Sequence, residues 1–270
     1  MLSIFFKIKL SAIYTLLRRG DRLPSVTAVQ LMLNNIARNE IASNPNSIVE
    51  LIAVDGIFGS QTERRVKHYQ SRLGYAQTGV LEPEQWRILL STHHLNVKDY
   101  ADTSDIEVQR VVNELNEYGG ETVTINQSIQ REEVFRRIIS GTASNSIVLL
   151  RIFSHGGPGY IRLTSGITTH ETSIHLRSRE QELDQLFRSI KHIMVPYGSM
   201  ELHGCRVGQG AVGARLLSRI ANVLGVPVSA GRTYQYMANR ATNNTFRFEG
   251  RTHTKCPNGM SLRDWSESLL

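Results

Sequence analysis

The chain has 270 residues, 40% of them hydrophobic and 20% charged, so it can fold as one large or two modest domains and is too apolar for long disorder. Basic residues exceed acidic ones by 31 − 24 = 7, which favours polyanionic surroundings such as a cell-wall polymer. No basic run or basic-aromatic array points to nucleic acid. Two cysteines, Cys205 and Cys256, exclude a disulfide scaffold and allow one bridge. The residue pattern predicts neither a metal nor another cofactor.

The first twenty residues, MLSIFFKIKLSAIYTLLRRG, are similar in composition to a signal peptide. Lys7 and Lys9 interrupt the apolar stretch, and no small-x-small cleavage site follows. The stretch is also too short for a transmembrane segment. We therefore expect residues 1–11 to be a lead-in element that packs on the first domain.

Three short helices are predicted between residues 12 and 94. The first follows Pro24, where apolar residues recur at helical spacing. The second opens at a capping box, Ser60 to Glu63, and ends at Gly74. The third begins near Pro83. Short helices joined by glycine-rich turns predict a small all-α domain.

Three segments of this domain, LLRRGDRLPSVTAVQLML, VDGIFGSQTERRVKHYQ and TGVLEPEQWRIL, carry a resemblance to a known family. They resemble the peptidoglycan-binding domain that is attached to many wall hydrolases. The matched positions are turn, cap and core residues: Gly20, Asp21, Gln30, Asp55, Gly56, Phe58, Gly59, Thr62, Gln70, Gly79 and Trp86. An insertion at about residues 39–49 departs from the family pattern. The resemblance implies targeting to peptidoglycan but identifies no contact residues.

Residues 95–103 are polar and aperiodic, which predicts a linker before a second domain at 104–270. In that domain a capping box at 104–107 opens a helix, and further helices are predicted at 131–139, 180–194 and 211–224. Strands are predicted at 121–125, 147–153, 200–202 and 226–229. This alternation predicts an α/β fold with a mostly parallel sheet flanked by helices. Function in such sheets gathers at the carboxyl ends of the strands.

Two predicted strands end at a reactive side chain among glycines, His155 in SHGGPG and Cys205 in HGCRVG. A cysteine attacks as its thiolate, and a nearby histidine can take the thiol proton. The resulting oxyanion needs backbone N–H donors, for which Gly156 and Cys205 are the candidates. The remaining residues predicted for the active-site turns are Ser154, Gly204, Arg206 and Gly208.

The two motifs, FSHGGPGYI and LHGCRVG, resemble those of the caspase-like cysteine peptidases, with a histidine 205 − 155 = 50 residues before the cysteine. Residues 147–248 are closer still to a caspase-like domain of unknown function in large bacterial surface proteins. The resemblance implies that His155 is the base and Cys205 the nucleophile. His203 and Gly204 stand where caspases have Gln-Ala, and no arginine can be assigned to an aspartate pocket, so caspase specificity is not implied.

These features predict a wall-targeted cysteine peptidase whose substrate is a wall-associated protein or a peptidoglycan stem. We expect it in the cell envelope, the periplasm or outside the cell without a cleaved signal, as a secreted effector or toxin with a secretion machinery or an immunity protein as partner. HGC also occurs in L,D-transpeptidases, which stay an alternative, as does a non-catalytic wall-binding module. His203 is the rival base, although strand alternation turns it away from Cys205.

Overall fold

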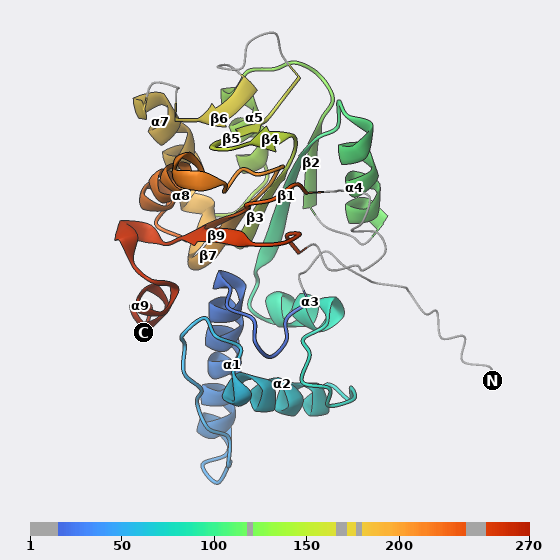
Figure 1. Cartoon of the computed structure of the whole chain (residues 1–270). Coiled ribbons are helices and arrows are strands. Elements are labelled where there is room, and N and C mark those ends of the chain that lie inside the picture. The colour runs from blue at the N-terminus through green and yellow to red at the C-terminus, as the bar shows by residue number, and fades with distance from the viewer. Residues whose placement is uncertain (1–15, 118–120, 166–171, 177–179, 236–246) are drawn as a thin grey trace, which may run out of the picture.

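The computed structural model describes residues 16–117, 121–165, 172–176, 180–235 and 247–270. A helical unit built from α1 to α3 lies below a larger α/β unit, and the C-terminal helix α9 returns beside α1 (Figure 1). The predicted lead-in element at residues 1–11 lies outside the described residues. Within the described ranges, no helix has the length and apolar character to cross a membrane.

The helical unit contains the three predicted helices, α1 (Pro24–Ser43), α2 (Ser60–Arg72) and α3 (Pro83–Thr92). Helix α1 continues into the segment that was predicted as an insertion. The predicted capping box at Ser60 is wrong, because the N-cap of α2 is Gly59 and no side chain bonds to it. A capping box does open α3, formed by Glu82 and Gln85.

Two buried glutamines hold the turns of the helical unit. The Nε2 of Gln30 donates to Asp55 Oδ1 at 2.9 Å, and its Oε1 accepts from the Gly56 N–H at 3.0 Å. The Oε1 of Gln70 accepts from the Gly79 N–H at 2.9 Å. Both glycines have a positive φ, 71° and 76°, which disfavours a side chain. The residues matched to the peptidoglycan-binding family therefore determine turns and core, as predicted.

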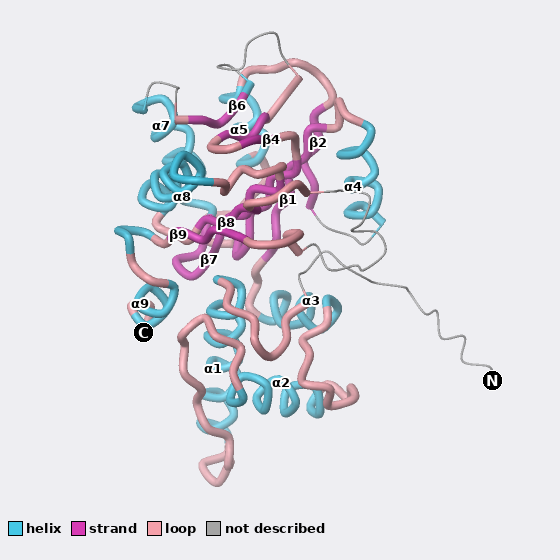
Figure 2. The backbone as a smooth tube through the Cα atoms, viewed as in Figure 1, coloured by secondary structure: helices cyan, strands magenta, loops and turns pink. Residues whose placement is uncertain are grey.

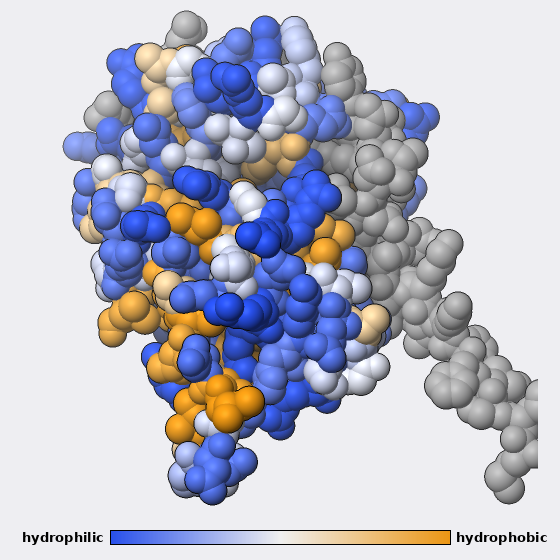
Figure 3. All heavy atoms as spheres, turned by 60° about the horizontal axis from the view of Figure 1, so that its bottom comes forward, coloured by the Kyte–Doolittle hydropathy of each residue, from blue (hydrophilic) through white to orange (hydrophobic). Residues whose placement is uncertain are grey.

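Apolar side chains also reach the surface of the helical unit. The view from below shows an apolar patch close to the tip of this unit (Figure 3). Its exposed large apolar residues are Ile41, Ile48 and Leu51, and Ile48 is 95% exposed. All three lie at the end of α1 or in the loop that follows it.

The larger unit is built on a six-stranded sheet (Figure 2). Its order is β2 (Glu121–Ile125), β1 (Asn96–Asp102), β3 (Ile147–Phe153), β7 (Met194–His203), β8 (Val228–Gly231) and β9 (Thr252–Lys255). The first five strands are parallel, and β9 runs antiparallel to β8. The predicted α/β fold with a mostly parallel sheet is thus confirmed. A small antiparallel sheet joins β4 (Gly156–Gly157), β5 (Tyr160–Arg162) and β6 (Ser173–His175).

The prediction of a linker at 95–103 is wrong, because residues 96–102 form β1 inside the sheet. The segment looks like a linker because it carries Lys98, Asp99 and Asp102, which are charged residues usually found in water. All three are buried here. A strand that carries buried charges on both faces lacks the apolar pattern on which the prediction rested.

Helices cover both faces of the sheet. They are α4 (Ile106–Glu117), α5 (Arg131–Ile139), α7 (Glu180–Ile190) and α8 (Gly210–Leu224), with α9 (Leu262–Glu267) beside α1. The helix predicted at 180–194 ends at Ile190, and β7 starts at Met194, six residues before its predicted start at 200. Strand β9 and helix α9 were not predicted.

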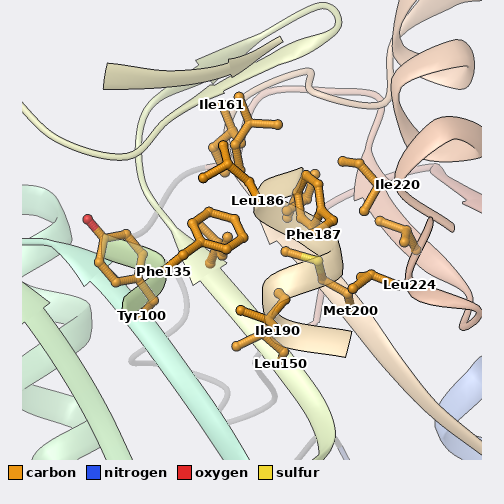
Figure 4. Close-up of a cluster of buried hydrophobic side chains, with 14 of the residues drawn as sticks. Tyr100, Phe135, Leu150, Ile161, Leu186, Phe187, Ile190, Met200, Ile220 and Leu224 are labelled. Atoms are coloured by element: carbon orange, nitrogen blue, oxygen red, sulfur yellow. The ribbon is translucent and has the colours of Figure 1, made fainter. Parts of the chain in front are cut away.

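The main core fills the space between the sheet and α5, α7 and α8 (Figure 4). Tyr100, Leu150 and Met200 point into it from three neighbouring strands. Phe135 and Phe187 meet there edge to face at 5.3 Å. Successive residues of a strand alternate between faces, so Ala101 and Phe153 lie on the other side, where they pack with α4.

A row of polar residues crosses that second face in register. Asp99 of β1 pairs with Arg151 of β3, which lies opposite Glu201 of β7. The Arg151 guanidinium donates to both carboxylate oxygens of Asp99 at 2.7 and 2.8 Å, and both side chains are 0% exposed. A buried, bidentate pair holds the register of β1 against β3, since a one-residue slip would leave both charges unpaired.

The helical unit and the α/β unit share one hydrophobic cluster. Val97, Val148, Leu149 and Val195, near the amino-terminal ends of three strands, pack with the apolar residues of α1 to α3. The Thr27 and Ser266 hydroxyls also meet at 2.7 Å between α1 and α9. The two units therefore sit in one fixed arrangement.

Removal of the Asp99 carboxylate is expected to be strongly destabilising. Asp99→Ala leaves the Arg151 charge buried without its carboxylate and should lower the free energy of unfolding by about 3–5 kcal/mol in a denaturant titration. Arg110→Ala, which breaks a half-exposed pair with Glu107, should cost less than about 1 kcal/mol. Equal costs for the two variants would contradict this account of the sheet register.

Candidate functional site

The register of β3 and β7 brings His155 and Cys205 to one edge of the sheet. Phe153 lies directly opposite His203 at the carboxyl ends of these parallel strands. His155 and Cys205 each follow two residues later. The Ser154 N–H donates to the His203 carbonyl at 3.4 Å, so the segments that follow β3 and β7 still lie side by side beyond the strands. The structure therefore places the predicted pair on neighbouring strand ends.

The segments that follow β3 and β7 are in backbone contact at Gly156 and Gly204. A Cβ built on Gly204 would lie 3.2 Å from the Gly156 Cα and 3.0 Å from Val207 Cγ2. Both glycines are thus needed for close approach, and neither has a positive φ. The predicted role of Gly204 and Gly208 in a tight turn is corrected accordingly, because Gly208 also has an ordinary φ and packs closely against the Ala230 carbonyl.

A third side chain, Asp105, joins the site. Its Oδ2 lies 3.1 Å from His155 Nε2, and its Oδ1 accepts the Glu107 N–H at 2.8 Å. The carboxylate therefore caps α4, in place of the predicted Ser104, and holds the imidazole at the same time. Ser104 instead donates its hydroxyl to Asp102 at 2.6 Å.

The charge of Asp105 follows from these contacts. Burial raises the pKa of Asp105, but the hydrogen bonds from His155 and from the first N–H groups of α4 outweigh that effect, so the pKa lies below its ordinary value. A carboxylate that accepts from Nε2 leaves Nδ1 of a neutral imidazole as a proton acceptor. His155 is 51% exposed, so this nitrogen can be reached from solvent or by a neighbouring group.

The Cys205 thiol contacts the loop after β8. The Gln235 N–H donates to Sγ at 3.5 Å, and the thiol donates to the Gln235 carbonyl at 3.6 Å. Gln235 is itself buried, with Nε2 donating to the Glu249 carbonyl at 3.0 Å. Within the described part of the chain, no hydrogen bond joins Cys205 to His155. The two residues therefore follow neighbouring strand ends, but the thiol is bonded to the Gln235 backbone.

His203, the rival base, is engaged elsewhere. Its Nε2 lies 2.8 Å from Glu201 Oε2, and its side chain is 0% exposed. The ring stacks between Phe153 at 4.6 Å and Phe248 at 4.3 Å. His203 is therefore held by Glu201 and the two rings and not beside Cys205. Strand alternation does not explain this, because residues two apart share a face of a strand and Cys205 lies beyond the end of β7.

Arg206, the residue after Cys205, has a left-handed backbone with φ 56°, which is uncommon for a side chain other than glycine. Its N–H donates to the Thr233 carbonyl at 2.9 Å, and its guanidinium lies 4.6 Å from the Tyr234 ring centre. Ser154, by contrast, is buried, and its hydroxyl has no hydrogen-bond partner among the described residues. The strained residue at the thiol turn is thus an arginine held by the β8 loop.

Two backbone N–H groups at the site are available as donors. The Arg162 N–H donates to the His155 carbonyl at 2.8 Å, which makes Gly156 and Ile161 a non-hydrogen-bonded pair of β4 and β5. The Gly156 N–H therefore points away from β5. The Cys205 N–H has no hydrogen-bond partner among the described residues. Both donors proposed from the sequence for the oxyanion remain candidates.

Sequence reasoning missed Asp105 and Gln235. Asp105 was noticed only within a capping box, because residues 95–103 were taken for a linker and the end of β1 was not counted as a strand end. Gln235 had no detectable signal, since it acts through its backbone. Among the described residues, no three metal-ligating side chains come together.

Comparison with known families assigns most of the α/β unit. The family described as "Domain of unknown function (DUF4347)" matches residues 101–249, more than half of the chain, including His155 and Cys205. The chain belongs to this family. Residues 22–89 match the family described as "Putative peptidoglycan binding domain". That match supports peptidoglycan as a partner and association with the cell wall. No curated protein matches the chain.

The two thiols should differ sharply in reactivity. Both cysteines are free, which excludes the bridge that the sequence allowed. Cys256 is 4% exposed, and burial raises its pKa to about 11. At neutral pH, iodoacetamide should therefore modify the half-buried Cys205 and leave Cys256 intact, as measured by peptide mass mapping. Denatured protein, in which both should react, is the control, and equal modification of the two thiols in the folded chain would contradict the prediction.

Proposed function

We propose that the chain is a cell-wall-associated cysteine peptidase in which Cys205 is the nucleophile, His155 the base and Asp105 a positioning residue. The observation that carries this proposal is the 3.1 Å contact between His155 and Asp105, at the strand end next to the one that bears Cys205. A histidine oriented by a carboxylate beside a thiol is an arrangement suited to acyl transfer.

In the proposed reaction, His155 Nδ1 takes the Cys205 proton as Sγ attacks the carbonyl carbon of a peptide bond. A C–S bond forms, and the carbonyl oxygen becomes an oxyanion that accepts from the N–H groups of Gly156 and Cys205. The C–N bond then breaks, and the imidazolium gives its proton to the leaving amine. Water, activated by His155, hydrolyses the thioester and regenerates the thiol.

Three further features support this reaction class. The site lies at the carboxyl ends of adjacent parallel strands, where function gathers in α/β sheets. Helix α8 begins five residues after Cys205, so its positive dipole end lies near the turn that carries the thiol. The Gln235 N–H donates to Sγ, a contact that favours a thiolate. Together with the motif spacing, they support a caspase-like peptidase.

The wall-binding match at residues 22–89 suggests the substrate, which is a wall-associated protein or a peptide stem of peptidoglycan. A secreted effector or toxin that acts in the cell envelope would combine wall binding with peptidase activity. The L,D-transpeptidase alternative loses support, since Cys205 lies in the turn after a parallel strand and before a long helix. The bond between Cys205 and the Gln235 backbone favours a second candidate, a wall-binding module without activity.

The proposal is tested by incubating the purified chain with peptidoglycan and with a peptide library, beside Cys205→Ala and His155→Ala. Wild type should release peptide products, and each variant should lose at least about a thousandfold of that activity, because the two residues act as a unit. Equal activity in all three would overturn the assignment. Newly formed cross-links in the wall would indicate a transpeptidase, and binding without turnover a module.

Two substitutions separate the roles of Asp105. Asp105→Asn keeps an oxygen to cap α4 but loses the carboxylate that orients His155, so kcat should fall at least about tenfold with stability nearly unchanged. Asp105→Ala should also lower the free energy of unfolding by about 1 kcal/mol. Equal losses of stability in the two variants, or full activity of Asp105→Asn, would contradict these roles.

The stability cost of Asp105→Ala should depend on pH. The folded pKa of Asp105 is lowered, so its contribution is complete above the ordinary carboxyl value of 3.8 and declines as the pH falls through the lower, folded value. Denaturant titrations of both proteins at neutral and acidic pH measure the difference. A cost that stays constant down to acidic pH would contradict this assignment.

A further inference from the structure

A hollow on the helical unit lies between the loop after α1 and one face of α2. Residues 48–52 form one wall, and Gln61, Arg64, Arg65 and His68 form the other. The spacing of these four residues places them on a single face of the helix. The hollow has a volume of about 200 Å³, enough for one amino-acid residue. Its loop wall overlaps the end of the insertion that distinguishes this chain from the family pattern.

Arg65 is a buried cation whose N–H groups are not all hydrogen-bonded. Its side chain is buried, it donates to the Leu33 carbonyl at 3.4 Å, and its Nε–H has no partner among the described residues. Burial lowers the pKa of Arg65, and the attraction of Glu40 offsets this only in part. A buried arginine of this kind favours an incoming carboxylate, which can accept two N–H groups at once.

The rest of the lining suits a small peptide. Arg64 is exposed and has no ion pair in the described ranges, whereas His68 lies 3.4 Å from Glu40. Glu50 is the one acid in the lining, against two arginines. Ile48 and Leu51 add exposed apolar surface, part of the patch at the tip of the unit (Figure 3). Charge and apolar surface together fit a carboxylate next to a short aliphatic side chain.

We propose that this hollow binds the stem peptide of peptidoglycan, with a stem carboxylate on Arg64 and Arg65 and an alanine methyl group on Ile48 and Leu51. The inference rests on the wall association of the N-terminal unit and not on the proposed peptidase. Stem peptides supply both carboxylates and methyl side chains. A glycan strand fits less well, because the lining contains no phenyl, phenol or indole ring on which a sugar could stack.

The test is calorimetric titration of the full chain carrying Cys205→Ala, which separates binding from any turnover. The probes are a synthetic stem tetrapeptide with free carboxylates, the same peptide with its carboxylates amidated, an unrelated acidic tetrapeptide and a peptide-free glycan oligomer. The free-acid stem peptide should bind at least about fivefold more tightly than each of the other three, since a charge-assisted hydrogen bond is lost without the carboxylate.

Arg64→Gln and Ile48→Ser alter exposed side chains, so both variants should fold, and each should weaken stem-peptide binding about threefold to tenfold. Arg188→Gln on α7, a matched loss of one exposed charge outside the hollow, should bind like the parent. The proposal is overturned if the glycan oligomer or the unrelated peptide binds as tightly as the stem peptide. It is also overturned if both hollow variants bind like the parent, whether or not the chain proves to be a peptidase.

Discussion

The candidate site depends on the register of three parallel strands. The buried pair of Asp99 and Arg151 holds β1 against β3, and Arg151 lies opposite Glu201 of β7. In this register Phe153 lies opposite His203, so His155 and Cys205 follow neighbouring strand ends. A one-residue slip of either strand would turn that strand over and change the placement of the residue that follows it. The ionic pair inside the sheet therefore fixes β1 against β3, whose carboxyl ends lead to Asp105 and His155.

The same strands also separate the site from the wall-binding unit. The helical unit packs on Val97, Val148 and Val195, near the amino-terminal ends, whereas the site lies at the carboxyl ends. A strand of seven residues spans about 20 Å, so a chain held on peptidoglycan would present Cys205 at that distance from its anchor. Arg247 and Phe248 bridge this span, because Arg247 bonds to the Leu16 carbonyl and Asp21, and Phe248 stacks on His203. The helical unit and the candidate site at the strand ends therefore sit in one fixed arrangement.

The periodicity of apolar residues and the positions of glycine and proline predicted most of the helices and the strand ends that lead to His155 and Cys205. They failed where charge is buried. Strand β1 looked like a linker because Asp99 and its charged neighbours are polar, although all three are buried and Asp99 is paired with Arg151 inside the sheet. Asp105 was hidden by the same error. Gln235 could not be found from sequence, because it touches Sγ through its backbone and depends on a loop distant along the chain. The pattern of apolar residues along the sequence shows which face of a helix or strand is buried. Which residues are partners across the sheet depends on the strand register, which the sequence pattern does not show.

The most direct test of the Cys205–His155 pair needs no substrate. It is the rate at which iodoacetamide alkylates Cys205 across the neutral pH range, in wild type and in His155→Gln, which keeps a polar side chain of similar size. If His155 accepts the thiol proton, the rate at neutral pH should fall about tenfold or more in the variant and the pH profile should change. Identical rates and identical profiles in the two proteins would contradict a functional pair.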